Sequence, residues 1–200
     1  MHTRRTALQV IGTILVSWPL RCARAQPGER AIAFIKSTTE QLVAIANTAS
    51  STQEKRRRLR EVLDAVVDHD DIARFCLGRF WRIATPAQQM QYMALFDDLL
   101  VAQIAGHLGE YAGVRVSMGL ARTFEDTEIV ITMVERTNSP VTRVDWVVGT
   151  GTGSPKIVDL IADGTSMRIT QASDFTSYLA HHQYNIQDLI EVMRQRSAQN

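Results

Sequence analysis

The densest group of side chains that could do chemistry is the run Asp68-His69-Asp70-Asp71. A histidine flanked by carboxylates could bind a divalent cation or transfer a proton at neutral pH. Adjacent residues do not share one face of a helix, however, and no second pair of ligands follows at the spacing of a metal site. We therefore predict a simpler role, in which Asp68 or Asp70 caps the helix that begins around Ile72.

Three other features invite a chemical interpretation. His181-His182 suggests a metal site, but neighbouring histidines point apart and no glutamate stands in zinc-site register. The glycine-rich segment 149–155 lacks the terminal Lys-Ser/Thr of a phosphate-binding loop and joins two predicted strands. Cys76 lies in an apolar helical turn, which favours a buried, inert thiol over a reactive one. The sequence thus predicts no catalytic residues, no metal ligands and no cofactor site.

Length and composition limit the class of protein. The chain has 200 residues, 45% of them hydrophobic, with 22 Lys and Arg against 21 Asp and Glu. These values suffice for one compact domain with a sizeable core and exclude a disordered chain. A formal charge of +1 argues against a nucleic-acid-binding protein, which carries a strong basic excess.

The first 25 residues have the composition of a secretory signal peptide. Arg4 and Arg5 precede an apolar run over residues 7–20, and Ala23-Arg24-Ala25 has the small-x-small pattern of a cleavage site. The apolar run is too short to span a bilayer comfortably. The start also resembles a twin-arginine export signal, although Ala7 replaces the usual large apolar residue.

We therefore predict a signal peptide over residues 1–25 and one mature domain over residues 26–200 in the periplasm. Cleavage would remove four positive charges and no negative ones, leaving 18 basic against 21 acidic residues. It would also remove Cys22, so that Cys76 could form no internal disulfide and stability would come from the core.

Periodicity and capping signals predict helices first, then strands, then helices. The clearest helix starts are the capping box in residues 51–54, the run Thr85-Pro86-Ala87-Gln88, and Asn185. The predicted helices cover residues 29–49, 51–66, 72–77, 85–108, 167–180 and 186–196, and the predicted strands cover 114–120, 129–134, 142–148 and 156–162. The predicted class is α+β, with N-terminal helices, a four-stranded mainly antiparallel sheet and C-terminal helices around an apolar pocket.

Two helices carry charges that need an explanation. The run from Lys55 to Arg60 could dock an acidic partner or anionic headgroups, but we favour a solvated helix face. The helix after Pro86 is apolar around much of its circumference and has Asp97 within the apolar arc. An unpaired carboxylate there would be costly, and Arg79 or Arg82 could neutralise it.

Residues 71–88 resemble a segment of the MlaC family, the periplasmic phospholipid carriers also called toluene-tolerance auxiliary proteins. The segment has Leu77-Gly78, Trp81-Arg82 and Thr85-Pro86 in the family's order. Further matching residues follow in the same order: Phe96-Asp97-Asp98-Leu99-Leu100, Tyr111, Val158-Asp159-Leu160, Asp163-Gly164-Thr165-Ser166-Met167, Phe175 and the closing segment 185–196. The chain departs from the family at Pro155, where a tryptophan is usual, and at Ala172, where an arginine is common.

The resemblance implies a helix-and-sheet fold whose deep apolar pocket holds acyl chains, without catalysis. Its cargo would be a phospholipid, or a hopanoid-like lipid as in one branch of the family. The carrier would move between an outer-membrane lipoprotein complex and an inner-membrane ABC transporter with its lipid-binding substrate protein. From the resemblance and the facing of side chains, the predicted lipid-binding residues are Leu77, Trp81, Met93, Phe96, Leu100, Ile104, Val116, Ile131, Val144, Trp146 and Phe175.

Two other classes of function stay open from the sequence. An enzyme with a cone-shaped helix-and-sheet fold could use such a pocket, with Asp145 or Asp97 as its acid or base. A non-enzymatic interaction module could instead use the basic residues 56–60 as its docking surface.

Overall fold

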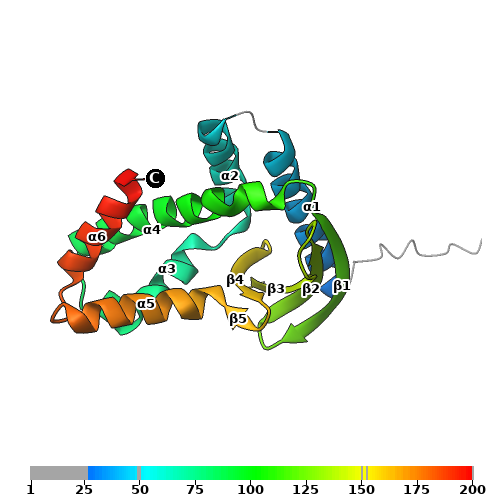
Figure 1. Ribbon diagram of the computed structural model, residues 1–200. Coiled ribbons are helices and arrows are strands. Elements are labelled where there is room, and N and C mark those ends of the chain that lie inside the picture. The colour runs from blue at the N-terminus through cyan, green and yellow to red at the C-terminus, as the bar shows by residue number, and fades with distance from the viewer. Residues whose placement is uncertain (1–26, 49–50, 150, 152, 200) are drawn as a thin grey trace, which may run out of the picture.

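The computed structural model describes residues 27–48, 51–149, 151 and 153–199 (Figure 1). The predicted signal peptide lies outside these residues. The elements are α1 (Pro27–Thr48), α2 (Thr52–Val66), α3 (His69–Leu77), η1 (Gly78–Arg82), α4 (Pro86–His107), η2 (Leu108–Tyr111), β1 (Arg115–Phe124), β2 (Thr127–Glu135), β3 (Thr142–Gly149), β4 (Lys156–Ala162), β5 (Thr165–Ser166), α5 (Met167–His181) and α6 (Ile186–Gln199). The α+β class is as predicted, with the two-residue β5 as an addition. Within the described part of the chain, no helix is both long and apolar enough to cross a membrane.

Local capping begins the helices where the sequence predicts. Thr85 accepts a hydrogen bond from the backbone N–H of Gln88, and the Gln88 side chain accepts one from the backbone N–H of Thr85, which completes the capping box of α4. The Asp68 carboxylate accepts a hydrogen bond from the backbone N–H of Asp71 and caps α3. The prediction that an acid beside His69 caps a helix is therefore confirmed.

The strands form one antiparallel sheet in chain order, from β1 to β5. Val130 pairs with Trp146 and Thr132 with Val144, whereas Ile131 pairs with Asp145 between them. Because successive side chains alternate between faces, the first two pairs share one face of the sheet and Ile131 lies on the other. The face with Val130 and Trp146 packs against α1, α2 and α4, and Figure 1 shows the sheet curving beside α1.

The apolar core has two parts that meet along α4. One part joins α1, α2 and the sheet, with Ile35 and Leu59 fully buried in it. The other joins α3, α5 and α6, with Tyr92 from the first half of α4 and Ile190 from α6 at its centre. Figure 1 shows this second part extending away from the sheet, where α6 lies across the ends of α4 and α5.

Three helices meet at a histidine. The Nδ1 atom of His69 on α3 lies 2.9 Å from the Asp97 carboxylate on α4, and its Nε2 atom lies 3.7 Å from the Asp64 carboxylate on α2. The hydrogen bond to Asp97 raises the pKa of His69. The partner of Asp97 is thus His69 and not Arg79 or Arg82, because α3 packs against α4 at this level.

Strand β4 is tied to the junction between α2 and α3. Val67 and Ile157 form an isolated parallel bridge between that junction and the strand. The Lys156 ammonium donates hydrogen bonds to the carbonyls of Asp64 and Ala65, at 3.2 and 2.7 Å. A cation at the last carbonyls of a helix stabilises its C-terminus, so the start of β4 fixes the end of α2.

Candidate functional site

A cavity of about 680 Å³ lies where the two parts of the core meet. Its volume falls in the middle of the range of small-molecule binding sites. The side chains on its wall are mostly aliphatic or aromatic, and the sheet and the helices α1 to α5 all contribute to it. Representative wall residues are Leu42 from α1, Val66 from α2, Ile72 from α3, Leu100 from α4, Trp146 from β3 and Leu160 from β4.

The indole of Trp146 is held in the wall by an internal hydrogen bond. Its Nε1–H donates to the Thr132 hydroxyl at 3.0 Å, and that hydroxyl donates to the carbonyl of Val144 at 3.0 Å. Thr132 is fully buried, so this chain of hydrogen bonds stays out of water. The polar edge of the indole is therefore satisfied inside the sheet, which leaves the ring as apolar surface for the cavity.

The threonines on the α1 side of the cavity are satisfied in the same manner. The Thr38 hydroxyl donates to the carbonyl of Phe34 at 3.0 Å, and the Thr39 hydroxyl donates to the carbonyl of Lys36 at 2.9 Å. Because each hydroxyl bonds its own helix, it does not demand a polar partner from a ligand. The middle of the cavity is thus suited to an apolar ligand.

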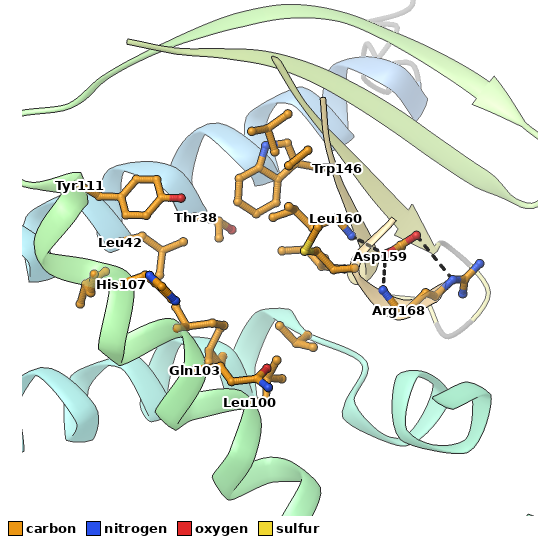
Figure 2. A pocket seen from close by; sticks show the side chains of 18 of the residues that line it. Thr38, Leu42, Leu100, Gln103, His107, Tyr111, Trp146, Asp159, Leu160 and Arg168 are labelled. Carbon is orange, nitrogen blue, oxygen red and sulfur yellow. Dashed lines mark hydrogen bonds and ion pairs between the residues drawn. The ribbon is translucent and has the colours of Figure 1, made fainter. Parts of the chain in front are cut away.

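Polar side chains gather at two ends of the cavity. Figure 2 shows His107 and Tyr111 at one end, Asp159 and Arg168 at the other, and Trp146 between them. At the second end, Asp159 accepts hydrogen bonds from the backbone N–H groups of Leu160 and Arg168, at 2.8 and 3.1 Å. These contacts fix the start of α5 against β4.

The structure places the predicted lipid-binding residues in two groups. The residues on the cavity wall are Phe96, Leu100, Ile104, Val116, Val144 and Trp146. The predicted residues that do not line the cavity are Leu77, Trp81, Met93, Ile131 and Phe175. Of these, Leu77 and Phe175 are buried in the helical part of the core, and Trp81 and Met93 pack against it. Ile131 lies on the sheet face opposite the cavity.

The polar cavity residues that were missed as site residues include His107, Arg136 and Arg168. Each is a single polar side chain near the end of an element, and no local pattern marks it. Tyr111 also lies on the wall, and it is one of the residues that match the MlaC family. That match was the one signal in the sequence that could have identified it as a site residue. An apolar helix beside a sheet predicts the apolar wall of the cavity, but it does not predict the polar residues at the two ends of the cavity.

The carboxylates of the enzyme alternative do not face the cavity. Asp145 lies on the opposite face of the sheet, where Arg143 Nε and Nη2 each donate to it at 2.8 Å. Asp97 is held by His69. Burial raises the pKa of the Cys76 thiol on the cavity wall to about 12, as expected for an inert cysteine. Among the described residues, no group of three or more His, Cys, Asp or Glu side chains could hold a metal ion.

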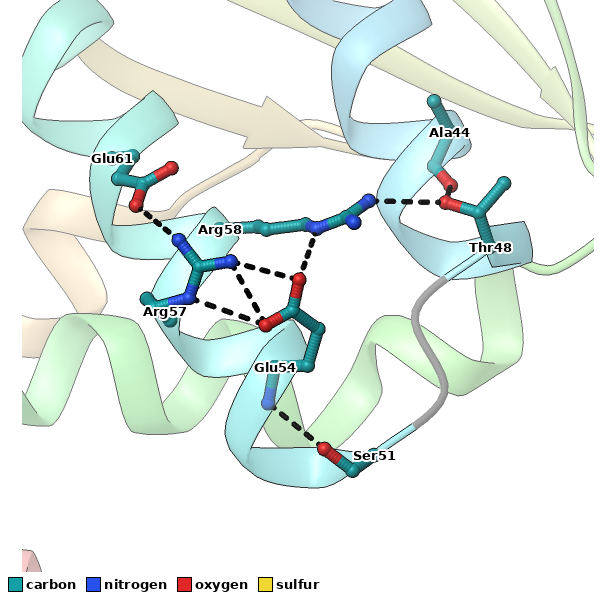
Figure 3. Close-up of polar contacts among 7 residues, drawn as sticks. All are labelled: Ala44, Thr48, Ser51, Glu54, Arg57, Arg58 and Glu61. Carbon is teal, nitrogen blue, oxygen red and sulfur yellow. Dashed lines mark hydrogen bonds and ion pairs between the residues drawn. The ribbon is translucent and has the colours of Figure 1, made fainter.

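The basic residues at the start of α2 are largely paired with acids (Figure 3). Arg57 and Arg58 both contact Glu54, at 2.8 and 2.6 Å, and Arg57 also contacts Glu61 at 2.7 Å. These arginines lower the pKa of Glu54 through their hydrogen bonds. Arg60 pairs with Asp98 on α4 at 2.6 Å. This pairing agrees with a solvated helix face and weakens the case for an anion-docking surface.

The fold and the site together define an α+β protein built around an apolar cavity. The family model described as MlaC protein matches residues 36–195, and the chain belongs to this family. A solved structure with a similar fold is the phospholipid-binding protein from Ralstonia solanacearum in complex with a phospholipid. The two chains superpose with a TM-score of 0.74 at 22% sequence identity, and the match covers 84% of this chain and 97% of that chain.

Proposed function

We propose that the mature chain is a periplasmic lipid carrier. It holds the acyl chains of a phospholipid or similar amphiphile in the cavity and shuttles the lipid between an outer-membrane lipoprotein complex and an inner-membrane ABC transporter with its lipid-binding substrate protein. The predicted signal peptide over residues 1–25 supports export, and membership in the MlaC family supports both the location and the cargo class. The complex of the Ralstonia solanacearum protein with a phospholipid supports a cavity of this fold as a lipid site.

The observation that carries this proposal is the apolar cavity with its internally satisfied polar atoms. A lipid that crosses water must hide its methylenes, because each one gains about 0.8 kcal/mol on leaving water. A segment of about twelve methylenes therefore gains roughly 10 kcal/mol in an apolar cavity. Such binding needs volume and apolar walls and no catalytic group. The proposed acyl contacts are Phe96, Leu100, Ile104, Val116, Val144 and Trp146.

The test is native mass spectrometry of the mature protein purified from a periplasm, followed by organic extraction and lipid analysis. We expect a stoichiometric adduct with the mass of a diacyl phospholipid or another membrane amphiphile. Purification could strip the lipid, so a protein without adduct is next offered phospholipid. Failure to bind the added lipid would refute the carrier function.

A matched pair of variants tests whether the cavity is the binding site. Leu100→Arg puts a long charged side chain on the cavity wall, and we expect it to lower the bound lipid at least about tenfold because desolvating the charge is costly. Leu120→Arg makes the same change at a position that is 80% exposed on β1 and should retain the full lipid load. If Leu100→Arg does not fold, Leu100→Trp replaces it in the test, because it fills part of the cavity without adding a charge. Full loading of a folded Leu100 variant would place the lipid elsewhere.

A further inference from the structure

Two arginines of the cavity, Arg136 and Arg168, each have a buried Nε–H that makes no hydrogen bond within the described residues, and the two differ in the acids around them. Arg136 follows the end of β2 and lines the cavity, and its side chain is 30% exposed. Its Nε atom is buried and makes no hydrogen bond within the described residues. Its Nη1 atom lies 3.5 Å from the Glu110 carboxylate, and its guanidinium lies 6.0 Å from the ring centre of Tyr111. A buried N–H without a partner is costly, which indicates a site prepared for an acceptor.

The acid beside Arg136 is shared with a second base. Glu110 contacts the Nδ1 atom of His107 at 3.0 Å, and this hydrogen bond lowers the pKa of Glu110. The carboxylate is thus divided between His107 and Arg136, with its shorter contact to the histidine. The side chains at this end of the cavity can therefore still attract an anion.

The opposite end of the cavity does not suit an anion. Arg168 there lies 3.7 Å from both Asp71 and Asp159, and its guanidinium lies 4.4 Å over the Phe75 ring. Asp159 lines the cavity and Asp71 lies beside Arg168, so two carboxylates face the one arginine at this end. Although the Nε–H of Arg168 also makes no hydrogen bond, an incoming phosphate would meet the like charges of Asp71 and Asp159 at this end.

The wall next to Arg136 leads directly into the apolar part of the cavity. Val134 lies two residues before Arg136, and Leu42 and Leu108 line the cavity from α1 and η2. Figure 2 shows Tyr111 at this end, with its hydroxyl directed toward Thr38 across the cavity. A lipid whose phosphate sits at Arg136 could extend its acyl chains from here past Trp146.

We propose that Arg136 anchors the phosphate of the bound phospholipid at the cavity end formed by His107, Tyr111 and the end of β2. The inference rests on the proposed function and orients the lipid within it, with the headgroup at Arg136 and the chains toward α3 and β4. The Nε–H and a neighbouring Nη–H of a guanidinium form a fork that matches two phosphate oxygens. A phosphodiester offers the buried Nε–H a charged acceptor, whereas a diacylglycerol with the same chains offers only neutral hydroxyl and ester oxygens.

The experiment compares two lipids that differ in phosphate. Delipidated mature protein is titrated with phosphatidylglycerol or with diacylglycerol of the same acyl chains, each delivered from cyclodextrin. The signal is the tryptophan fluorescence, since Trp146 lines the cavity and Trp81 lies outside it. We expect Arg136→Gln to weaken phosphatidylglycerol binding at least about tenfold and to leave diacylglycerol binding unchanged. Arg136→Lys keeps the charge without the fork and should fall between the wild type and Arg136→Gln.

Arg115→Gln is the matched control, because it removes one positive charge from a side chain that is 84% exposed and pairs with Glu135 beside Arg136. It should leave the binding of both lipids unchanged. Arg168→Gln tests the opposite end of the cavity, and a selective loss of phosphatidylglycerol binding in that variant would overturn the proposed orientation. Equal losses for both lipids in Arg136→Gln, or no loss, would also overturn it.

Competition with glycerol 3-phosphate tests whether Arg136 binds the phosphate of a lipid headgroup or a soluble phosphate. We expect it not to displace phosphatidylglycerol, because the acyl chains supply most of the binding free energy. Tight binding of glycerol 3-phosphate to the wild type would assign Arg136 to a soluble phosphate and overturn the headgroup role. If the wild type binds neither lipid, the carrier function itself fails, whereas an unchanged phosphatidylglycerol affinity in Arg136→Gln refutes the anchor alone.

Discussion

The hydrogen bond behind Trp146 is the most direct test of how the cavity wall is built. Thr132→Val is nearly isosteric, but it removes the hydroxyl that accepts from the indole Nε1–H at 3.0 Å. Thr132 is fully buried and Trp146 nearly so, and the indole is left with a buried donor that has no partner. We expect the free energy of unfolding to fall by about 2 kcal/mol, the usual cost of such a donor.

The assay is thermal unfolding of the delipidated mature protein, followed by circular dichroism. For a domain of this size, each 1 kcal/mol shifts the melting temperature by about 2–4 °C, so Thr132→Val should melt roughly 4–8 °C lower. Thr132→Ser is the control, because it keeps the hydroxyl and loses one methyl group, at about 1 kcal/mol. If Thr132→Val is as stable as Thr132→Ser or more stable, the hydroxyl does not hold the indole and the reasoning fails.

Two further predictions concern a partly buried histidine and a buried cysteine. His69→Gln should lower the free energy of unfolding more at about pH 5.5 than at about pH 8.5, because the hydrogen bond to Asp97 raises the pKa of His69 in the folded protein. The stability that this pair adds is complete below the pKa of the unfolded chain, about 6.5. It is lost as the pH rises through the pKa of the folded protein. Urea unfolding of the wild type and the variant across this pH range measures the loss. A loss that is equal at the two pH values, or larger at pH 8.5, contradicts the ion pair. Cys76 should react with a thiol reagent at pH 8 at least about a hundredfold more slowly in the folded protein than in urea, since burial raises its pKa to about 12. Similar rates in the two states would show that the thiol is accessible from the cavity.

Local signals predicted the elements well, because a cap or a period is decided by residues close in sequence. The capping box at Thr85 and Gln88 and the cap at Asp68 formed as predicted. The partner of Asp97 could not be predicted in this manner, since His69 approaches it only after α3 packs on α4. The short strand β5 was missed because two residues carry no periodicity.

The cavity wall was harder to predict than the fold for two physical reasons. In β2 both faces are apolar, so alternation alone could not tell whether Val134 or Ile131 faces the cavity, and Val134 does. In α4 the apolar surface runs around much of the helix, and its neighbour changes along its length. Met93 meets the helical part of the core, whereas Leu100, two turns later, lines the cavity. The angular position of a residue around the helix axis does not show which neighbour it meets along the length of the helix.

The size of the cavity itself argues that it is more than a packing defect. The cavity of about 680 Å³ is open to solvent, so without a ligand water enters it and contacts its apolar wall. The sequence nevertheless keeps the wall rigid, with the indole hydrogen-bonded inside the sheet and the α1 threonines bonded to their own helix. An apolar ligand that replaces this water gains the free energy of leaving water, and its binding stabilises the folded domain. The apolar wall that water covers in the absence of a ligand thus supplies the driving force for holding a lipid.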